Sequence, residues 1–582
     1  MAYRKPGVEV TFQQRTLSPN VVTPTLAPVI IGQGYWVAEI SDNKDSQFLA
    51  TITNTHTGLY GVSGIVGGAY IAWEGVSAGG EVRTVEIVSG TITLPTYCSG
   101  GLEADSVYVD LEGSSVTASG ANSGRTRHLW SNEFAVTGED TLTPVITISG
   151  HYHDDTPGAS GLAHDYSFSQ IKVGYRALRT DLERLIEIDG VDAINDQIGK
   201  ICAENPLSLA LYNTLANSNT VVYGYGINST DEADQTAHDS AMSFISARDI
   251  YTIVPLTQNA SRHTAYVAHV DLYSTPVNKR ERILICSRPA HDSLETSTAK
   301  TTVAQQTAAL AYELSNRRVT YTFPPVGFIE ERKHISTLSP SYIEAITPTG
   351  MNLNVSGLLA KLTSTITLVD GTKYYKDADI TTAVWSGIMD DCNESRGDYD
   401  YLTVRYPVAG YIFAANVAGQ IAGLPPQQGF TNLNIAGNLV EVRYSSDWFS
   451  ESQLDTIAAG GNYILFQSTL NSRIKCRHQL TTDMSSIERR ELSITKVLDY
   501  TAKTLRTTLE PYIGKYNITP EFLQKLGTVI NAVKVLLKRA GVIADLAIES
   551  IAQDTIEPDV VLVTVMVKPY YPANYIRITL AF

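Results

Sequence analysis

The stretch from about residue 221 to residue 323 alternates between strand patterns and helix patterns, and this alternation constrains the fold more than any other feature. Short apolar, β-branched runs are separated by amphipathic stretches of helical period. The expected strands are 221–227, 250–256, 282–287 and 319–323, and the helices between them are about 229–246, 261–273 and 296–317. Such alternation requires right-handed crossovers, which place the strands parallel in one sheet with helices on both faces. We therefore expect a doubly wound-like α/β domain.

A sheet of this kind binds ligands at the carboxyl ends of its strands. Those ends carry neither a glycine-rich phosphate loop nor a dinucleotide-binding fingerprint. The sequence also lacks an HExxH zinc motif and a nucleophile elbow. Its five cysteines are widely spaced, which argues against a disulfide framework or a zinc site. We expect a protein that is not an enzyme and that has no cofactor and no bound metal.

The 582 residues are too many for one core, and changes in pattern predict several domains around the parallel sheet. Glycine-rich turns and short strands predict β-rich insertions, and a mixed pattern predicts an α+β C-terminal domain. The expected units are an N-terminal extended arm at 1–20, a β-rich outer domain at 21–165, the α/β domain at 166–325, a β-rich insertion at 326–404, a C-terminal core domain at 405–567 and a terminal strand at 568–582. The α/β domain is expected to begin with a helix at 176–188.

Two long helices are expected in the C-terminal domain. A capping box at 485–488 predicts a helix that reaches about Leu509. Thr519, followed by a proline, predicts the start of a second helix that reaches Arg539. A nearly continuous β-branched run at 560–567 then predicts a strand that is buried on both faces.

Both ends of the chain have the alternating pattern of short strands and lie next to prolines. The apolar residues on one face are Val8, Val10 and Phe12 near the start, and Ile576, Ile578 and Leu580 at the end. Prolines 569 and 572 lack the amide hydrogen that a strand ladder needs, so the last strand is expected on an extended tether. This strand either closes the chain's own sheet or is donated to a neighbouring subunit.

The net charge of −16 is unevenly distributed. From residue 469 onward, 15 basic residues stand against 11 acidic ones, whereas the rest of the chain has 29 against 49. This excess is too weak for general nucleic-acid binding, and it indicates either an acidic protein partner or scatter in surface charge. No apolar run approaches the ~20 residues of a membrane span, and no signal-peptide core follows the first residues. We therefore expect no direct nucleic-acid contact, no membrane insertion and synthesis in a cytoplasm.

A long, ordered set of segments is similar to a known family. In the C-terminal part these are 473–482, 490–500, 513–519 and Pro572-Ala573-Asn574-Tyr575-Ile576, joined by 418–425, 251–257 and the opening 6–10. In these segments the chain resembles the tail sheath proteins of contractile bacteriophages. The resemblance is strong over about 405–582, moderate over 170–325, and absent over 31–150 and 330–385, which have the character of lineage-specific outer domains.

The resemblance implies a structural subunit of a virion tail, assembled in the host cytoplasm as stacked hexameric rings around a tail tube. Baseplate and tail-terminator proteins are then further partners, and contraction drives the tube through the host envelope for genome delivery. In such a sheath, the strand at Val8–Phe12 and the strand at Ile576–Leu580 pair with the C-terminal sheet of a neighbouring subunit. We also expect Lys534 and Lys538, on the basic face of the helix at 521–539, to face the tube.

Two other functions are consistent with the sequence. The first is a sheath subunit of another contractile injection device, such as a bacteriocin or a secretion system, which the chemistry of the residues does not distinguish from a phage tail. The second is a cytoplasmic α/β enzyme with accessory β-domains. Long striated tubules or rings in the electron microscope would distinguish a sheath protein from such an enzyme.

Overall fold

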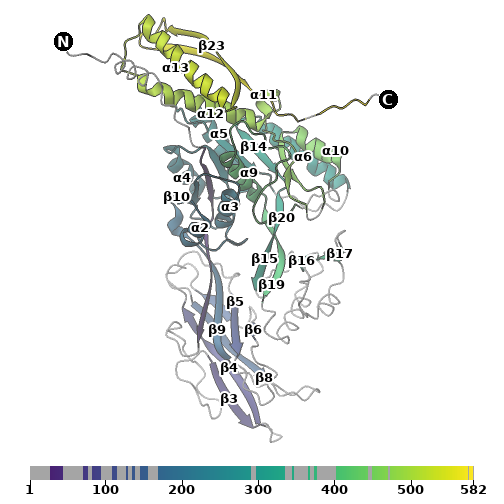
Figure 1. Ribbon diagram of the computed structural model, residues 1–582. Helices are drawn as coiled ribbons and strands as arrows, with labels where there is room; N and C mark the ends of the chain where they lie inside the picture. The colour runs from purple at the N-terminus through teal and green to yellow at the C-terminus, as the bar shows by residue number, and fades with distance from the viewer. Residues whose placement is uncertain are drawn as a thin grey trace, which may run out of the picture.

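The computed structural model shows an elongated molecule with helices and a β-ribbon at one end, an α/β domain in the middle and β-strands at the other end (Figure 1). It describes residues 26–43, 70–76, 82–93, 108–113, 126–128, 134–137, 145–154, 168–289, 297–334, 344–345, 365–367, 373–375, 401–442, 449–469, 472–574 and 576–580. The expected N-terminal strand with Val8, Val10 and Phe12 lies outside the described residues.

The middle of the molecule is built on an eight-stranded sheet, and its six central strands run parallel. In spatial order the strands are β10 (Ile186–Ile188), β11 (Val222–Gly226), β1 (Pro28–Gly32), β12 (Thr252–Pro255), β13 (Ile283–Ser287), β14 (Val319–Phe323), β21 (Asn462–Phe466) and β22 (Lys475–Cys476). Only the outermost strands, β10 and β22, are antiparallel to their neighbours. The expected parallel α/β sheet is confirmed.

Helices cover both faces of this sheet, and each face has its own apolar core. One face packs against α2 (Val191–Gln197), α3 (Pro206–Leu215) and α9 (Tyr411–Gly423), and the other against α4 (Gln235–Ser246) and α5 (Ala260–Tyr273). Next to β21, α6 (Ser297–Leu314) packs against α10 (Glu451–Ala459). Every residue of β1, β13 and β14 is buried, because these strands lie inside the sheet with helices on both faces.

The sheet takes strands from far beyond the expected limits of the α/β domain. Strand β1 lies between β11 and β12, so residues 28–32 belong to the parallel sheet and not to a β-rich domain at 21–165. Strand β21 pairs with β14, and α9 packs on the same sheet, so these parts of 405–567 also belong to the central domain. The local pattern of a segment carries no information on which strands from distant parts of the chain join the same sheet.

Two β-rich insertions leave the carboxyl ends of parallel strands on antiparallel stalks. After β1, strand β2 (Tyr35–Asn43) pairs with β9 (Phe168–Leu178), with Tyr35 opposite Leu178. After β14, strand β15 (Val326–His334) pairs with β19 (Tyr401–Ala409), with Val326 opposite Ala409. Because each stalk brings the chain back to its starting point, a long insertion leaves the central sheet intact.

The insertions contain three small antiparallel sheets. Their strand orders are β2-β9-β5-β6, β3-β4-β8-β7 and β17-β18-β16-β19-β15-β20. The remaining strands are β3 (Tyr70–Val76), β4 (Val82–Thr93), β5 (Tyr108–Gly113), β6 (Thr126–His128), β7 (Phe134–Thr137), β8 (Val145–Asp154), β16 (Glu344–Ala345), β17 (Thr365–Thr367), β18 (Lys373–Tyr375) and β20 (Leu439–Val442). The mixture of parallel and antiparallel sheets agrees with the expected overall α+β class.

Three helix predictions were wrong. The stretch 176–188 is the end of β9, a 3-10 turn at Thr180–Leu182 and strand β10, because its apolar residues serve two strands. Helix α4 begins after Asp234, whose side chain accepts from the Ala237 amide, and not at about residue 229 as expected. The helix expected from 485 to 509 is divided at Glu491, which has extended backbone angles, into α11 (Ile487–Arg490) and α12 (Leu492–Leu509).

The C-terminal end of the molecule is a module of two helices and a two-stranded ribbon, which we call the ribbon module. It consists of α12, α13 (Pro520–Arg539), β23 (Ile543–Gln553) and β24 (Val561–Pro569). Helix α13 begins as expected, with the Thr519 hydroxyl accepting from the Phe522 amide. The module has a small apolar core of its own, to which α12, α13 and β23 contribute.

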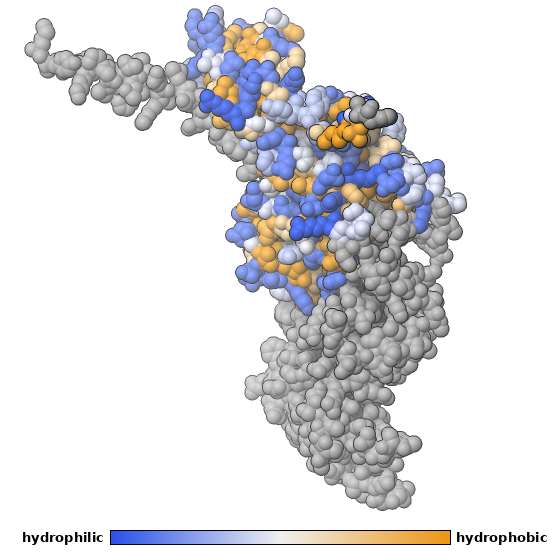
Figure 2. All heavy atoms as spheres, turned by 45° about the vertical axis from the view of Figure 1, so that its right-hand side comes forward, coloured by the Kyte–Doolittle hydropathy of each residue, from blue (hydrophilic) through white to orange (hydrophobic). Residues whose placement is uncertain are grey.

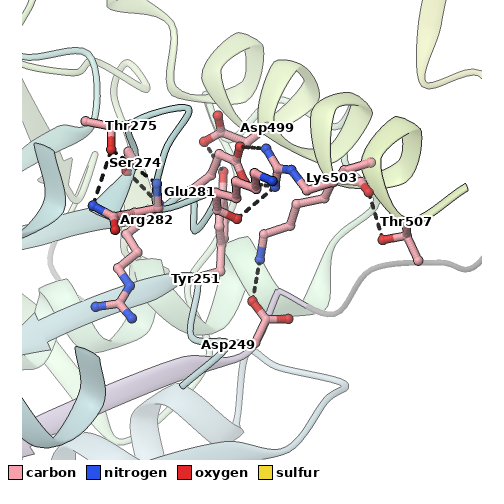
Figure 3. Close-up of polar contacts among 12 residues, drawn as sticks. Asp249, Tyr251, Ser274, Thr275, Glu281, Arg282, Asp499, Lys503 and Thr507 are labelled. Carbon is pink, nitrogen blue, oxygen red and sulfur yellow. Dashed lines mark hydrogen bonds and ion pairs between the residues drawn. The ribbon is translucent and has the colours of Figure 1, made fainter. Parts of the chain in front are cut away.

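Helix α12 lies across the amino ends of three adjacent parallel strands and is bound there by ion pairs. Asp499 accepts two hydrogen bonds from Arg318 at 2.6 and 2.8 Å, just before β14, and one from the Tyr251 hydroxyl at 3.1 Å. The other two pairs are Lys503 with Asp249 at 2.9 Å, before β12, and Arg506 with Glu281 at 2.5 Å, before β13. Figure 3 shows Asp499 and Lys503 reaching from α12 toward Tyr251 and Asp249. These contacts attach the ribbon module to the central sheet.

We expect Asp499→Ala to lower the free energy of unfolding by roughly 3–5 kcal/mol, because it leaves the buried Arg318 guanidinium without its carboxylate partner. Denaturant titration measures this change. The control is Asp455→Ala, which removes an exposed partner of Arg477 and should cost at most about 1 kcal/mol. Equal losses in the two variants would contradict the assigned role of the buried pair.

The buried histidine His263 should make the fold sensitive to acid. Its ring contacts the Thr257 carbonyl at 2.9 Å, and burial lowers its pKa from 6.5 to about 4. The unfolded chain therefore takes up this proton at a higher pH than the folded chain, so the contribution to stability is complete above pH 6.5 and is lost as the pH falls toward 4. The loss amounts to about 3 kcal/mol over that window.

Unfolding free energies measured from pH 8 to pH 4.5 test this expectation. The variant His263→Gln should lose less stability than the wild type on acidification, because it cannot take up the proton. Its own value at pH 8 serves as the reference, since histidine is neutral there in both states. Parallel pH profiles for the two proteins would show that His263 does not supply the acid sensitivity.

Candidate strand-pairing interface

The ribbon of β23 and β24 is covered on one face only. The two strands are antiparallel, with Leu546 opposite Val567 and Gln553 opposite Val561. On the inner face, Val563, Val565 and Val567 pack against the core formed with α12 and α13. On the outer face, Leu562 is 50% exposed and Met566 is 58% exposed. The prediction that 560–567 is buried on both faces was wrong, because helices lie against only one side of this strand.

Both edges of the ribbon are open within the part of the chain that the structure describes. The sheet that contains β23 and β24 has no third strand there. An open edge presents a row of amide and carbonyl groups that another extended segment can pair with. A two-stranded ribbon is also only marginally stable alone, and further strands on a helix-backed sheet stabilise it. The ribbon can therefore accept one added strand at each edge.

The C-terminal segment is an extended strand-like segment without a partner in the described chain. Residues 576–580 follow β24 and the short stretch 570–574, and they are assigned to no strand. Ile576, Ile578 and Leu580 are 82%, 79% and 86% exposed. Figure 1 shows the end of the chain running away from the body of the molecule. In the described residues this segment does not close the chain's own sheet.

The exposed surface of the ribbon module combines hydrophobic and hydrophilic areas. Figure 2 shows hydrophobic residues gathered at the top of the molecule, over the ribbon module, and near the end of the chain, with hydrophilic residues between them. Single exposed apolar residues are common, but a chain end with three alternating ones has little reason to stay in water. Burial of these three side chains at about 1.5–3 kcal/mol each would favour pairing with another strand.

The expected basic face of α13 is present, but its two lysines are not isolated. The ammonium groups of Lys534 and Lys538 each lie 3.1 Å from the same carboxylate oxygen of Asp545, at the start of β23. Hydrogen bonds from both lysines lower the pKa of Asp545 to about 2. The cluster is at the surface and keeps one net positive charge. The expectation that these lysines face a partner stays a prediction.

The carboxyl ends of the parallel strands, where a ligand would bind, are occupied by the chain itself. The Gln258 amide donates to the carbonyl oxygens of Arg288, at 3.1 Å, and Pro325, at 2.7 Å. Gly410 approaches so closely that a Cβ there would lie 2.5 Å from the Pro324 carbonyl oxygen and from the Ser287 hydroxyl. These loops hold the start of a β-rich insertion in place of a ligand.

The described residues offer neither a metal site nor a membrane-spanning helix. They contain no cluster of three or more histidine, cysteine, aspartate or glutamate side chains placed to hold a metal ion. Among the same residues, no helix combines the length and the apolar character that crossing a membrane requires. An open surface depression lies along α4, next to Tyr225, Asp239 and Phe244.

The chain was compared with known proteins. No protein-family model matches it, and no curated protein matches it. Solved structures to which it is similar include the sheaths of two contractile assemblies and a sheath tail protein.

The helical sheath of the anti-feeding prophage, in its contracted state, has 11% sequence identity and a TM-score of 0.43, over 69% of this chain and 90% of that one. The contracted sheath of an extracellular contractile injection system, PVC, has 11% identity and a TM-score of 0.44, over 69% and 86%. A sheath tail protein from Listeria innocua has 10% identity and a TM-score of 0.37, over 97% and 96%. With identities and TM-scores this low, the function has to be argued from the chain's own residues.

Proposed function

We propose that this chain is the structural subunit of a contractile tail sheath, which polymerises by exchanging strands between neighbouring subunits. One observation carries the proposal. The same chain has a helix-backed ribbon with two open edges and a terminal segment with exposed, alternating apolar residues at 576–580. Acceptor and donor are different surfaces, so the contact between copies is heterologous and extends into an array instead of closing a dimer.

Two donated strands would convert the ribbon into a four-stranded sheet backed by α12 and α13. One is the C-terminal strand, with Ile576, Ile578 and Leu580, and the other is the N-terminal strand, with Val8, Val10 and Phe12, each from a neighbouring subunit. Main-chain hydrogen bonds along a strand set a definite register, while the extended tethers allow the linked subunits to move. A lattice whose rings rotate and slide without separating needs both properties.

The resemblance of the sequence to phage tail sheaths extends the proposal to the whole assembly. Subunits form hexameric rings stacked around a tail tube, between a baseplate and a tail terminator, in a virion tail assembled in the host cytoplasm. Contraction moves the subunits as rigid bodies and drives the tube through the host envelope for genome delivery. The ion pairs that bind α12 to the sheet support this, because they let the ribbon module and the sheet move together. No catalysis, cofactor, membrane insertion or direct nucleic-acid contact is part of this function.

Deletion of residues 575–582 should leave a folded, soluble subunit that forms no tubules, because the donor strand is missing while the core is unchanged. The thermal midpoint should stay within about 2 °C of the wild type, since a loss of well under 1 kcal/mol shifts it by no more than that. Negative-stain electron microscopy and thermal unfolding measure the two quantities.

A matched pair of point variants sharpens this test. Ile578→Pro removes a main-chain donor and should weaken or abolish assembly, whereas Ile578→Val keeps the strand and should assemble. Normal tubules from the truncated protein would overturn strand donation.

The lysine cluster on α13 should contribute to binding of the tube. The double variant Lys534→Glu, Lys538→Glu should impair assembly on the tube. It changes the net charge of the cluster that these two residues form with Asp545 from +1 to −3. Asp545→Asn, which leaves both lysines without their acidic partner, should preserve or strengthen this assembly. Co-sedimentation of subunits with purified tubes at two salt concentrations measures the effect, and unaltered binding by the double variant would refute a tube-facing position.

A further inference from the structure

The short stretch between β24 and the exposed terminal segment is attached to the central domain. Pro569, at the end of β24, is buried, and Pro572 lies next to Gly429. The Tyr571 hydroxyl donates to the Glu488 carboxylate at 2.8 Å. The chain thus crosses from the ribbon onto the region around α11 before it leaves the surface. Among the residues that the structure describes, Asn574 is the last one with a contact of this kind.

The side chain of Asn574 lies on a buried carboxylate. Its amide nitrogen is 3.0 Å from an oxygen of Glu491 and 3.1 Å from Nε2 of His478. A weaker contact of 3.4 Å joins its carbonyl oxygen to the Thr431 hydroxyl. All three partners belong to the central domain and not to the ribbon. Asn574 therefore connects the terminal segment 576–580 to the body of the subunit.

The carboxylate of Glu491 is fully buried and needs donors. Its Oε2 accepts from the Gln479 amide at 3.0 Å, and its Oε1 lies 2.9 Å from Nε2 of His478. Nε2 cannot donate to Glu491 and accept from Asn574 at the same time. The shorter contact to a charged acceptor assigns Nε2–H as the donor to Glu491. The Asn574 amide then donates to the same oxygen and supplies one of three hydrogen bonds to this carboxylate, which also forms an ion pair with Arg490 at 3.5 Å.

The backbone of Glu491 is fixed by its neighbours in the central domain. It lies between α11 and α12 and forms a β-bridge with Leu480. Helix α12, which follows it directly, is bound to the amino ends of the parallel strands through Asp499 and Arg318. A contact with Glu491 therefore fixes the start of the terminal segment 576–580 relative to the whole subunit.

We propose that Asn574 is a positioning residue that fixes where and in which direction the segment 576–580 leaves the subunit, by docking on the buried carboxylate of Glu491. When its first residue is held in place, the terminal segment samples fewer conformations. Less conformational entropy is then lost when it pairs with another strand. The use of this direction for assembly rests on the proposed function, whereas the docking contact belongs to the single subunit. Asparagine suits this position because aspartate, with the same shape, would place a second carboxylate about 3 Å from Glu491.

The experiment measures the position of the terminal segment 576–580 in the isolated subunit. Spin labels on Ile578→Cys and Asn531→Cys report the distance between the tail and α13 by pulsed electron paramagnetic resonance, at concentrations too low for assembly. Cys98 and Cys392 are replaced by serine, and the buried Cys202, Cys286 and Cys476 are retained. Asn574→Asp should broaden the distance distribution at least about twofold, because like charges at this spacing repel. Tyr571→Phe, which removes the neighbouring exposed hydrogen bond, should leave the distribution narrow.

A reversed pair separates docking from a general loss of structure. Glu491→Gln combined with Asn574→Asp restores one donor and one acceptor, and it should narrow the distribution again. An unchanged distribution in Asn574→Asp, or a double variant as broad as the single one while its thermal midpoint equals that of the wild type, would overturn the proposal. Assembly is scored separately by electron microscopy. A wild-type protein that never forms tubules would contradict the sheath function and leave the measured docking of Asn574 in place.

Discussion

The attachment of α12 to the amino ends of the parallel strands is the contact on which the rest of the molecule depends. Asp499 and Arg318 form a buried, doubly hydrogen-bonded pair, and Lys503 and Arg506 extend the contact to the next two strands. A buried pair of this kind adds little net stability compared with apolar packing, but loss of one partner is costly. Its main effect is geometric, since it gives the ribbon module one defined orientation on the sheet.

This attachment also divides the molecule into two functional ends. The ribbon module lies at the amino ends of the parallel strands, and the two β-rich insertions leave from the carboxyl ends of β1 and β14. Strand β1 runs parallel to β12, so the chain enters it at the amino ends of the sheet and leaves it at the carboxyl ends. The proposed interface is therefore separated from the insertions by the full length of the strands, and the insertions are free to vary without disturbing it.

Much of the central domain was predictable because its signals are local. The strands β11 to β14 and the helices α5 and α6 were expected within a few residues of where they lie, and α13 has the expected cap at Thr519. The position of β1 was not predictable, since a five-residue apolar run is compatible with any sheet. The ion pairs of α12 left a faint signal, namely Asp499, Lys503 and Arg506 at helical spacing on one face.

The sequence by itself determined the strand–helix alternation of the central sheet and the alternating apolar residues at 576–580, because both follow from the period of the side chains. Only the tertiary structure decided that β24 keeps one face and one edge open, that Asp545 pairs with Lys534 and Lys538, and that Asn574 docks on Glu491. Those outcomes depend on which elements meet in space. Residues more than eighty positions apart, such as Glu491 and Asn574, carry no mark in the sequence that they will touch.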